Sequence, residues 1–198
     1  SEVVRESLPS CIDWCKYAQD CVGQQAFSKY MQDKDETIKE KLIKELENYF
    51  GSDEKRITHS KRVMQFAEEL LKEQGGDWHI VIPASILHDV GIKVAEQHGS
   101  TAGHYHQKEG PAIAKKILLK LGLKKEDIDE ICEIIAHHHI REAFETNNFR
   151  ILYDADRLVN LKDEIDIVDK PTLERAINEI FLTEHGKRIA RRIYIDNR

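Results

Sequence analysis

The chain has 198 residues, of which 40% are hydrophobic and 33% are charged, as is typical of a globular protein with one domain or one domain and an extension. No apolar run approaches the roughly 18 residues of a membrane helix, and the first 30 residues lack the basic start and apolar centre of a signal peptide. We therefore expect a cytoplasmic protein without a membrane partner. The net charge of −6 and the lack of a long basic run disfavour duplex nucleic acid as a partner.

Apolar residues recur at helical spacing along most of the chain, and the alternating pattern of strands is rare, so we predict an all-α protein. Two amphipathic helices are predicted at residues 35–50 and 58–74, each followed by glycine. The segment 78–91 is apolar on nearly every side, which is typical of a buried helix. Residues 94–106 contain glycine, serine and histidine and are predicted to form a loop.

The second half of the chain continues the helical pattern. Residues 110–121 and 124–139 are amphipathic, and acidic residues occupy the first turns of the latter, where the helix dipole favours them. Further helical segments follow at residues 148–161 and 171–194. The expected total is about seven or eight helices, which favours a helical bundle.

The N-terminal residues 1–34 differ in composition from the rest and hold three of the four cysteines, so we predict a helical extension there and the main domain at residues 35–198. Cys11, Cys15 and Cys21 lie close together in the sequence. A thiolate metal site or an iron–sulfur site lacks a fourth cysteine nearby, and the spacing matches no common cluster motif. Free thiols are the preferred interpretation.

Several predicted helices turn a histidine or an aspartate toward the apolar core. His59, His88 and Asp156 each lie three or four residues from an apolar residue that their own helix directs inward. His138 continues the apolar stripe of its helix, whereas His137 falls toward the other face. One buried histidine is usually a satisfied core residue, but this many inward-facing polar side chains favour a shared partner.

A divalent metal ion is the partner that suits these side chains. Neutral imidazole nitrogen and carboxylate oxygen are the ligands of zinc, iron, manganese and similar ions. His106 joins the group if the helix predicted at residues 110–121 begins several residues earlier. A cation would use the imidazole lone pairs and cancel the carboxylate charge, so we predict a buried metal site.

The order of these residues resembles the signature of a known family. His59, then the adjacent His88 and Asp89 in ILHDVG, and finally Asp156 in DADRL are similar to the H…HD…D signature of the HD-domain metal-dependent phosphohydrolases. The resemblance covers roughly residues 35–198. It implies an all-α HD-domain bundle with a buried metal site in its middle, in which these four residues hold the first metal.

Some members of this family have two more histidines between the HD pair and the final aspartate, and then bind two metals. This sequence resembles that subset, because His106 in HYHQKEGP matches the first extra position and IIAHHH contains the second. His138 is favoured for the second position, with His137 next. Asp89 would then be the catalytic residue that bridges the ions. The expected cofactors are one or two divalent metal ions (Fe, Mn, Zn, Co, Ni or Mg).

The resemblance implies an enzyme that hydrolyses a phosphate ester of a small phosphorylated substrate, such as a nucleotide, with water that the metal activates. No nucleophile elbow, P-loop or dinucleotide motif favours another chemistry. Lys93 and Arg157 are the candidate substrate-binding residues, and Lys108 and Arg141 also flank the motifs. Two alternatives remain open, a di-iron oxygenase on the same scaffold and a non-catalytic metal-binding regulatory module. The sequence predicts no oligomeric state.

Overall fold

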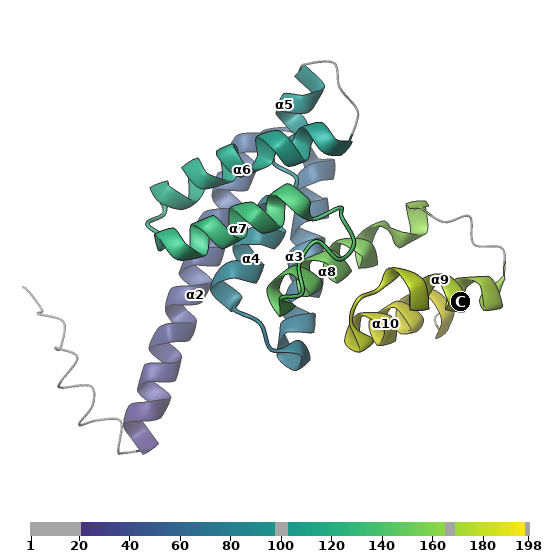
Figure 1. Cartoon of the computed structure of the whole chain (residues 1–198). Coiled ribbons are helices and arrows are strands. Elements are labelled where there is room, and N and C mark those ends of the chain that lie inside the picture. The colour runs from purple at the N-terminus through teal and green to yellow at the C-terminus, as the bar shows by residue number, and fades with distance from the viewer. Residues whose placement is uncertain (1–20, 98–102, 165–168, 197–198) are drawn as a thin grey trace, which may run out of the picture. The chain divides into compact units, whose positions relative to one another are not determined.

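The computed structural model describes residues 21–97, 103–164 and 169–196, and every regular element in these ranges is a helix (Figure 1). The all-α class predicted from the sequence is therefore confirmed. None of the described helices is both long enough and apolar enough to cross a membrane.

The chain divides into two compact units, residues 1–38 and 39–198. The boundary falls inside α2 (Cys21–Phe50), which contributes residues to both units. The boundary that the sequence predicts, after residue 34, lies in the same helix. Cys11, Cys15 and the side chain of Cys21 lie outside the described part of the first unit.

The second unit contains the last residues of α2, from Lys39, and all the helices that follow it. These are α3 (Glu54–Gln74), α4 (Trp78–Leu87), α5 (Ile92–Gln97), α6 (Gly103–Lys120), α7 (Lys125–His137), α8 (Asn147–Glu164), α9 (Lys170–Ile180), α10 (Glu184–Arg191) and the short π-helix η1 (Arg192–Asp196).

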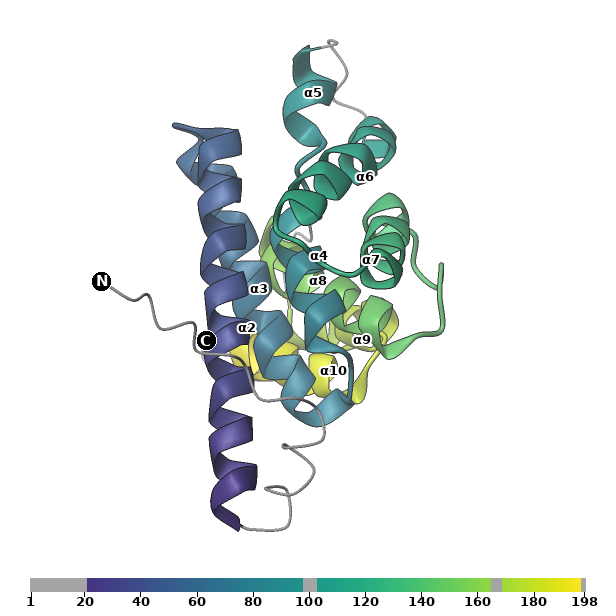
Figure 2. The same cartoon turned by 90° about the vertical axis from the view of Figure 1, so that its left-hand side faces the viewer.

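Helix α4 is the centre of the second unit. It packs against α3, α7 and α8, and Figure 2 shows it between α3 and α7. Every residue from Ile80 to Leu87 is buried, which confirms the prediction of a buried helix from an apolar run. Helix α4 ends at the buried Leu87, so the turn that follows it, with His88 and Asp89, begins in the interior of the bundle.

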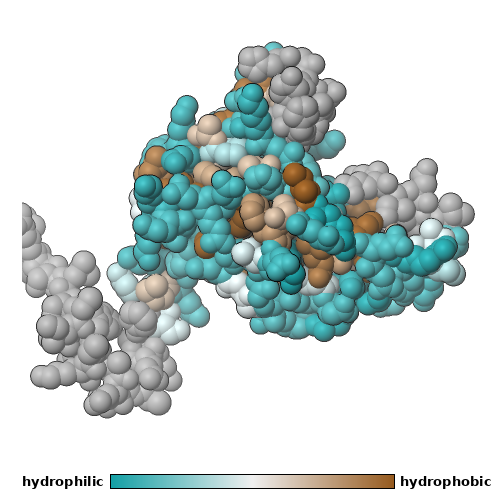
Figure 3. All heavy atoms as spheres, in the orientation of Figure 1, coloured by the Kyte–Doolittle hydropathy of each residue, from teal (hydrophilic) through white to brown (hydrophobic). Residues whose placement is uncertain are grey.

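Helices α3 and α8 pack against each other along one side of this core. Helix α3 buries a stripe that includes Val63, Ala67 and Leu70, and α8 buries Phe149 and Leu152. The packing brings His59 of α3 and Asp156 of α8 close to His88, which follows the end of α4. On the face drawn in Figure 3, hydrophilic side chains predominate and apolar ones occur only in scattered groups.

Two of the predicted elements differ from the structure. The loop predicted at residues 94–106 begins in fact with helix α5, whose Ala95 is buried, and α6 starts at Gly103. The helical segment predicted at residues 171–194 is divided into α9, α10 and η1, with Phe181 extended before α10. The break forms because Thr183 caps α10 by accepting a hydrogen bond from the Gly186 N–H, so a second helix can start there.

Candidate metal centre

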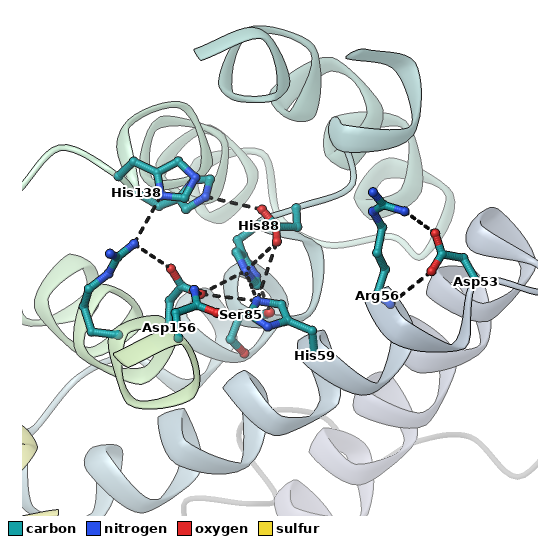
Figure 4. A network of polar contacts seen from close by, with 11 residues as sticks. Asp53, Arg56, His59, Ser85, His88, His138 and Asp156 are labelled. Atoms are coloured by element: carbon teal, nitrogen blue, oxygen red, sulfur yellow. Dashed lines mark hydrogen bonds and ion pairs between the residues drawn. The ribbon is translucent and has the colours of Figure 1, made fainter. Parts of the chain in front are cut away.

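Three segments far apart in the sequence bring four polar side chains together. His59 comes from α3, His88 and Asp89 follow the end of α4, and Asp156 comes from α8. Figure 4 shows the side chains of His59, His88 and Asp156 turned toward one another. His59 Nε2 lies 3.2 Å from His88 Nε2 and 3.3 Å from Asp156 Oδ1, and His88 Nε2 lies 3.4 Å from Asp89 Oδ2.

These distances fit a metal ion. Two further pairs, His59 with Asp89 and His88 with Asp156, are each 3.6 Å apart, so these five distances span 3.2–3.6 Å. The donor atoms of His59, His88 and Asp89 form a group that can hold an ion. Three atoms with this spacing lie about 2.0 Å from a common central point, within the range of about 2.0–2.2 Å for bonds from protein nitrogen and oxygen to zinc. His59, His88 and Asp89 therefore fit a divalent ion in both ligand type and spacing, and Asp156 adds a carboxylate beside both imidazoles.

The backbone orients the imidazoles so that the correct nitrogen faces the centre. His88 Nδ1 lies 2.9 Å from the carbonyl oxygen of Ser85, and His138 Nδ1 lies 2.7 Å from that of Ile135. A carbonyl oxygen only accepts hydrogen bonds, so Nδ1 carries the proton in each ring and the neutral Nε2 presents a lone pair. Fixing the tautomer in this way is characteristic of metal-binding histidines.

The carboxylates of Asp89 and Asp156 favour a positive charge between the four side chains. Burial by itself would lower the pKa of His88, but the carboxylates of Asp89 and Asp156 outweigh burial and raise the pKa well above its ordinary value. Burial by itself would raise the pKa values of both aspartates, but the facing histidines hold these pKa values well below the ordinary range. The two ionised carboxylates thus attract either a proton or a metal cation.

The other oxygen of Asp89 faces a second group. Asp89 Oδ1 lies 3.6 Å from Nε2 of His138, which is completely buried. The donor atoms of Asp89, His138 and His139 all lie within 4.8 Å of one another and form a second group that can hold an ion. His137 is placed differently: its Nδ1 donates to the Glu133 carbonyl oxygen at 2.9 Å and its ring lies against Phe144. The side chain of His106 lies outside the described residues.

Comparison with known proteins agrees with this arrangement. The HD domain model matches residues 56–161, more than half of the chain, and this range includes all four residues of the first group. The chain belongs to the HD-domain family. A search of the curated proteins found no match.

A solved structure shares the fold of this HD protein. It is a protein described as a predicted HD superfamily hydrolase from an uncultured Thermotogales bacterium, with a TM-score of 0.59 and 24% sequence identity. The similarity covers 77% of this chain and 83% of the other.

Two residues outside the predicted set of site residues, Asn160 and His139, also contribute to the candidate metal centre. Asn160 Nδ2 donates to Asp156 Oδ1 at 2.8 Å and so orients that carboxylate. Its position one helical turn after Asp156 is the signal that was available in the sequence. The second is His139, which is exposed and yet belongs to the second group of donors.

The structure places the two candidate substrate-binding residues in structural contacts. Lys93 Nζ donates to the carbonyl oxygen of Tyr49 at 2.5 Å and lies over the ring of the same tyrosine. The Arg157 guanidinium donates to Asp156 Oδ2 at 3.2 Å and lies 3.4 Å from His139 Nδ1. Arg157 thus contacts a candidate metal ligand directly, whereas Lys93 joins the start of α5 to the end of α2.

A cleft of about 660 Å³ gives access to the centre. His59 and Asp89 lie in its wall, so a small molecule in the cleft reaches the first group of donors. Lys93 and Arg157 are not among the described residues that line it. The lining residues are Glu54, Lys55, Arg56, Thr58, His59, Arg62, Asp89, Ile92, Val159 and Asn160.

Asp154 lies two residues before Asp156 but belongs to a different part of the structure. It is completely buried and accepts hydrogen bonds from the Leu182 N–H at 2.8 Å, the Thr183 N–H at 2.9 Å and the Thr183 hydroxyl at 2.7 Å. Burial raises the pKa of Asp154 to about 6, although these three donors partly oppose the shift. Its contacts join α8 to the start of α10, which is a structural role.

Proposed function

We propose that the protein is a metal-dependent phosphohydrolase that cleaves a phosphate ester of a small phosphorylated metabolite, such as a nucleotide. The observation behind this proposal is the convergence of His59, His88 and Asp89, whose donor atoms lie 3.2–3.6 Å apart, at the wall of a cleft of about 660 Å³. A cleft of this size suits a small metabolite. Membership of the HD family agrees with the proposal.

Each residue of the first group has a definable task. A divalent ion bound here would activate water and neutralise the charge of the phosphate. His88, which is completely buried, is held by the Ser85 carbonyl group and fixes the inner side of the site. His59 and Asp89 form the side that faces the cleft, where the substrate arrives. Asn160 and Arg157 each donate to one oxygen of Asp156 and keep its carboxylate in place.

The lining of the cleft favours water as the nucleophile. The described lining residues include no serine and no cysteine, and their single hydroxyl group belongs to Thr58. No imidazole or carboxylate forms a hydrogen bond with Thr58 among the contacts of the described residues, so nothing activates it as a nucleophile. Asp89 faces donors on two sides, which supports a site with two ions, as suits hydrolysis of phosphate esters.

The test is phosphate release from a panel of phosphate esters with Mn, Fe, Co, Zn, Ni or Mg. We expect Asp89→Ala to lower the rate by about a hundredfold or more, because its carboxylate contacts both groups of donors. Asp129→Ala is the matched control, since Asp129 is exposed and its only described ion pair joins it to Lys115 at 3.4 Å. Equal rates in wild type and Asp89→Ala with every metal would contradict the proposal.

The same samples separate the alternatives that the sequence leaves open. Dioxygen consumption by the iron-loaded protein, without phosphate release from any ester, would replace the proposal with an oxygenase. Stoichiometric metal without turnover of either kind would replace it with a regulatory module.

A further inference from the structure

Three cations line the cleft beside the metal centre, although the protein has a net charge of −6. They are Lys55, Arg56 and Arg62, all on α3. The carboxylates in the lining are Glu54 and Asp89. Asp89 faces the metal centre, and Glu54 is the first residue of α3, where the positive end of the helix dipole offsets its charge. The described lining therefore has more cations than carboxylates, whereas the protein as a whole is acidic.

Among the described residues, only one of the three cations has a hydrogen-bond or ion-pair partner. The Arg56 guanidinium pairs with Asp53 and with Glu96, the latter at 2.5 Å, and these contacts fix it at the edge of the cleft. Lys55 and Arg62 are exposed, and no hydrogen bond or ion pair joins either side chain to another described residue. Lys55 exerts only a longer-range attraction on Asp53. The charges of Lys55 and Arg62 are thus available to a ligand.

Helix geometry places one of these two cations before, and the other after, His59 along the axis of α3. Lys55 lies four residues before His59 and Arg62 lies three residues after it. Viewed down the axis of an α-helix, both side chains point within about 60° of the direction of the His59 side chain, and both are rotated from it in the same sense. They are separated by roughly 10 Å along the helix axis. A molecule that reaches past His59 into the metal centre therefore passes both cations.

We propose that Lys55 and Arg62 bind a second phosphate of the substrate while the phosphate to be cleaved lies at the metal centre. This inference rests on the proposed function and specifies its substrate class as small molecules with two phosphates a few bonds apart. The rest of the cleft suits such a molecule, because Ile92 and Val159 can contact a short carbon skeleton. The described lining includes no phenylalanine, tyrosine or tryptophan on which a base could stack.

A binding experiment tests this inference without turnover. Propane-1,3-bisphosphonate and propylphosphonate have the same carbon chain but differ by one anionic group, and neither has a phosphate ester bond to cleave. Calorimetry on the full chain loaded with Mn²⁺, at fixed ionic strength because exposed charges are screened by salt, gives the ratio of their affinities. We expect the bisphosphonate to bind wild type about tenfold more tightly, as one or two exposed charge-assisted contacts allow.

The ratio of the bisphosphonate affinity to the propylphosphonate affinity should fall close to one in the double variant Lys55→Ala/Arg62→Ala. It should remain near the wild-type value in Lys55→Arg. The matched control is Lys61→Ala/Lys72→Ala, which removes two positive charges from α3 at positions outside the lining of the cleft. Lys61 pairs instead with Glu47 at 2.6 Å. An unchanged ratio in Lys55→Ala/Arg62→Ala would overturn the inference, and so would an equal loss in the control, which would indicate a general charge effect.

Phosphate release from 4-nitrophenyl phosphate separates this inference from the proposed function. Release by a wild type that binds both phosphonates equally would preserve the function and overturn the second phosphate site. A clear preference for the bisphosphonate, lost in Lys55→Ala/Arg62→Ala, would support the anion site even if no ester were cleaved, and the proposed function would then fail alone.

Discussion

The Nε2 atoms of His59 and His88 lie 3.2 Å apart, although one residue belongs to α3 and the other follows the end of α4. The Nδ1–H group of His88 is bonded to the Ser85 carbonyl oxygen, so in the neutral ring the lone pair of Nε2 points at His59. At this distance the two nitrogens can share either a proton, donated by His59, or a metal cation that both lone pairs bind. The carboxylates of Asp89 and Asp156 beside them supply the negative charge that such a cation requires.

The first prediction is that a divalent metal stabilises the folded protein. An ion at a hundred times its dissociation constant adds about 2.7 kcal/mol, which for a chain of this size raises the midpoint of thermal unfolding by roughly 5–10 °C. His59→Ala should abolish this metal-dependent increase. Its side chain is only half-buried, so the variant should still fold.

The measurement is the difference in midpoint between metal-loaded and chelator-treated samples of each variant, which cancels any change in basal stability. Lys61→Ala, on the same helix but paired with Glu47, should keep the full increase. A metal-dependent increase in His59→Ala as large as that of wild type would show that His59 is not a ligand.

The second prediction separates two neighbouring histidines. His138 Nε2 faces Asp89 Oδ1 at 3.6 Å, whereas the exposed His137 bonds its own helix through Glu133. We therefore expect His138→Ala to lower the number of metal ions bound per chain at saturation, and His137→Ala to leave it unchanged. Elemental analysis after equilibrium dialysis measures both. A loss in His137→Ala, or none in His138→Ala, would assign the second group differently.

Within the helices, local pattern was sufficient to predict where a side chain points. The apolar run at residues 78–91 predicted a buried helix, and Ile80 to Leu87 are buried. His59 and Asp156 lie inside α3 and α8, so their distance from apolar neighbours indicated the inward face, and the structure brings them together. This succeeds because the period of 3.6 residues holds throughout a regular helix.

Local pattern was insufficient wherever a helix ends. Helix α7 ends at His137, so helical periodicity does not predict the direction of the His139 side chain. The structure nevertheless places His139 close to Asp89. Lys93 is separated by 44 residues from Tyr49, whose carbonyl oxygen accepts its hydrogen bond, and no local rule links the two. The cleft is built from α3, α8 and the turns around α5, so only the tertiary packing defines it.

The third prediction concerns Asp53, which caps the helix that carries His59. Its side chain accepts a hydrogen bond from the Arg56 N–H, and Asp53→Ala should lower the free energy of unfolding by about 1 kcal/mol. Slight burial would raise the pKa of Asp53, but the contacts with Arg56 hold it below its ordinary value of 3.8. A carboxyl whose pKa is lower in the folded state stabilises the fold above its unfolded pKa. This contribution is lost as the pH falls through the lowered pKa.

Asp53→Asn is the matched variant, since asparagine caps helices equally well but carries no charge. It should be less stable than wild type by about 0.5 kcal/mol at neutral pH, the usual size of an exposed ion pair. The difference should vanish as the pH falls below the lowered pKa of Asp53. Urea unfolding at a series of pH values measures it, and a difference that grows toward acid pH would show that the sign is wrong.

The last prediction concerns Asp154 and Gly186, which couple α8 to α10. Asp154→Ala removes the acceptor of three hydrogen bonds at the start of α10 and should lower the free energy of unfolding by about 2–4 kcal/mol. Gly186→Ala should lower it by about 1–3 kcal/mol, because the added Cβ would lie 2.9 Å from Asp154 Cγ and 3.0 Å from Thr183 Oγ1. In the double variant the missing carboxylate leaves room for the Cβ, so the combined loss should be smaller than the sum by about 1 kcal/mol. Urea unfolding of the four proteins measures this coupling, and strictly additive losses would show that the two residues do not oppose each other.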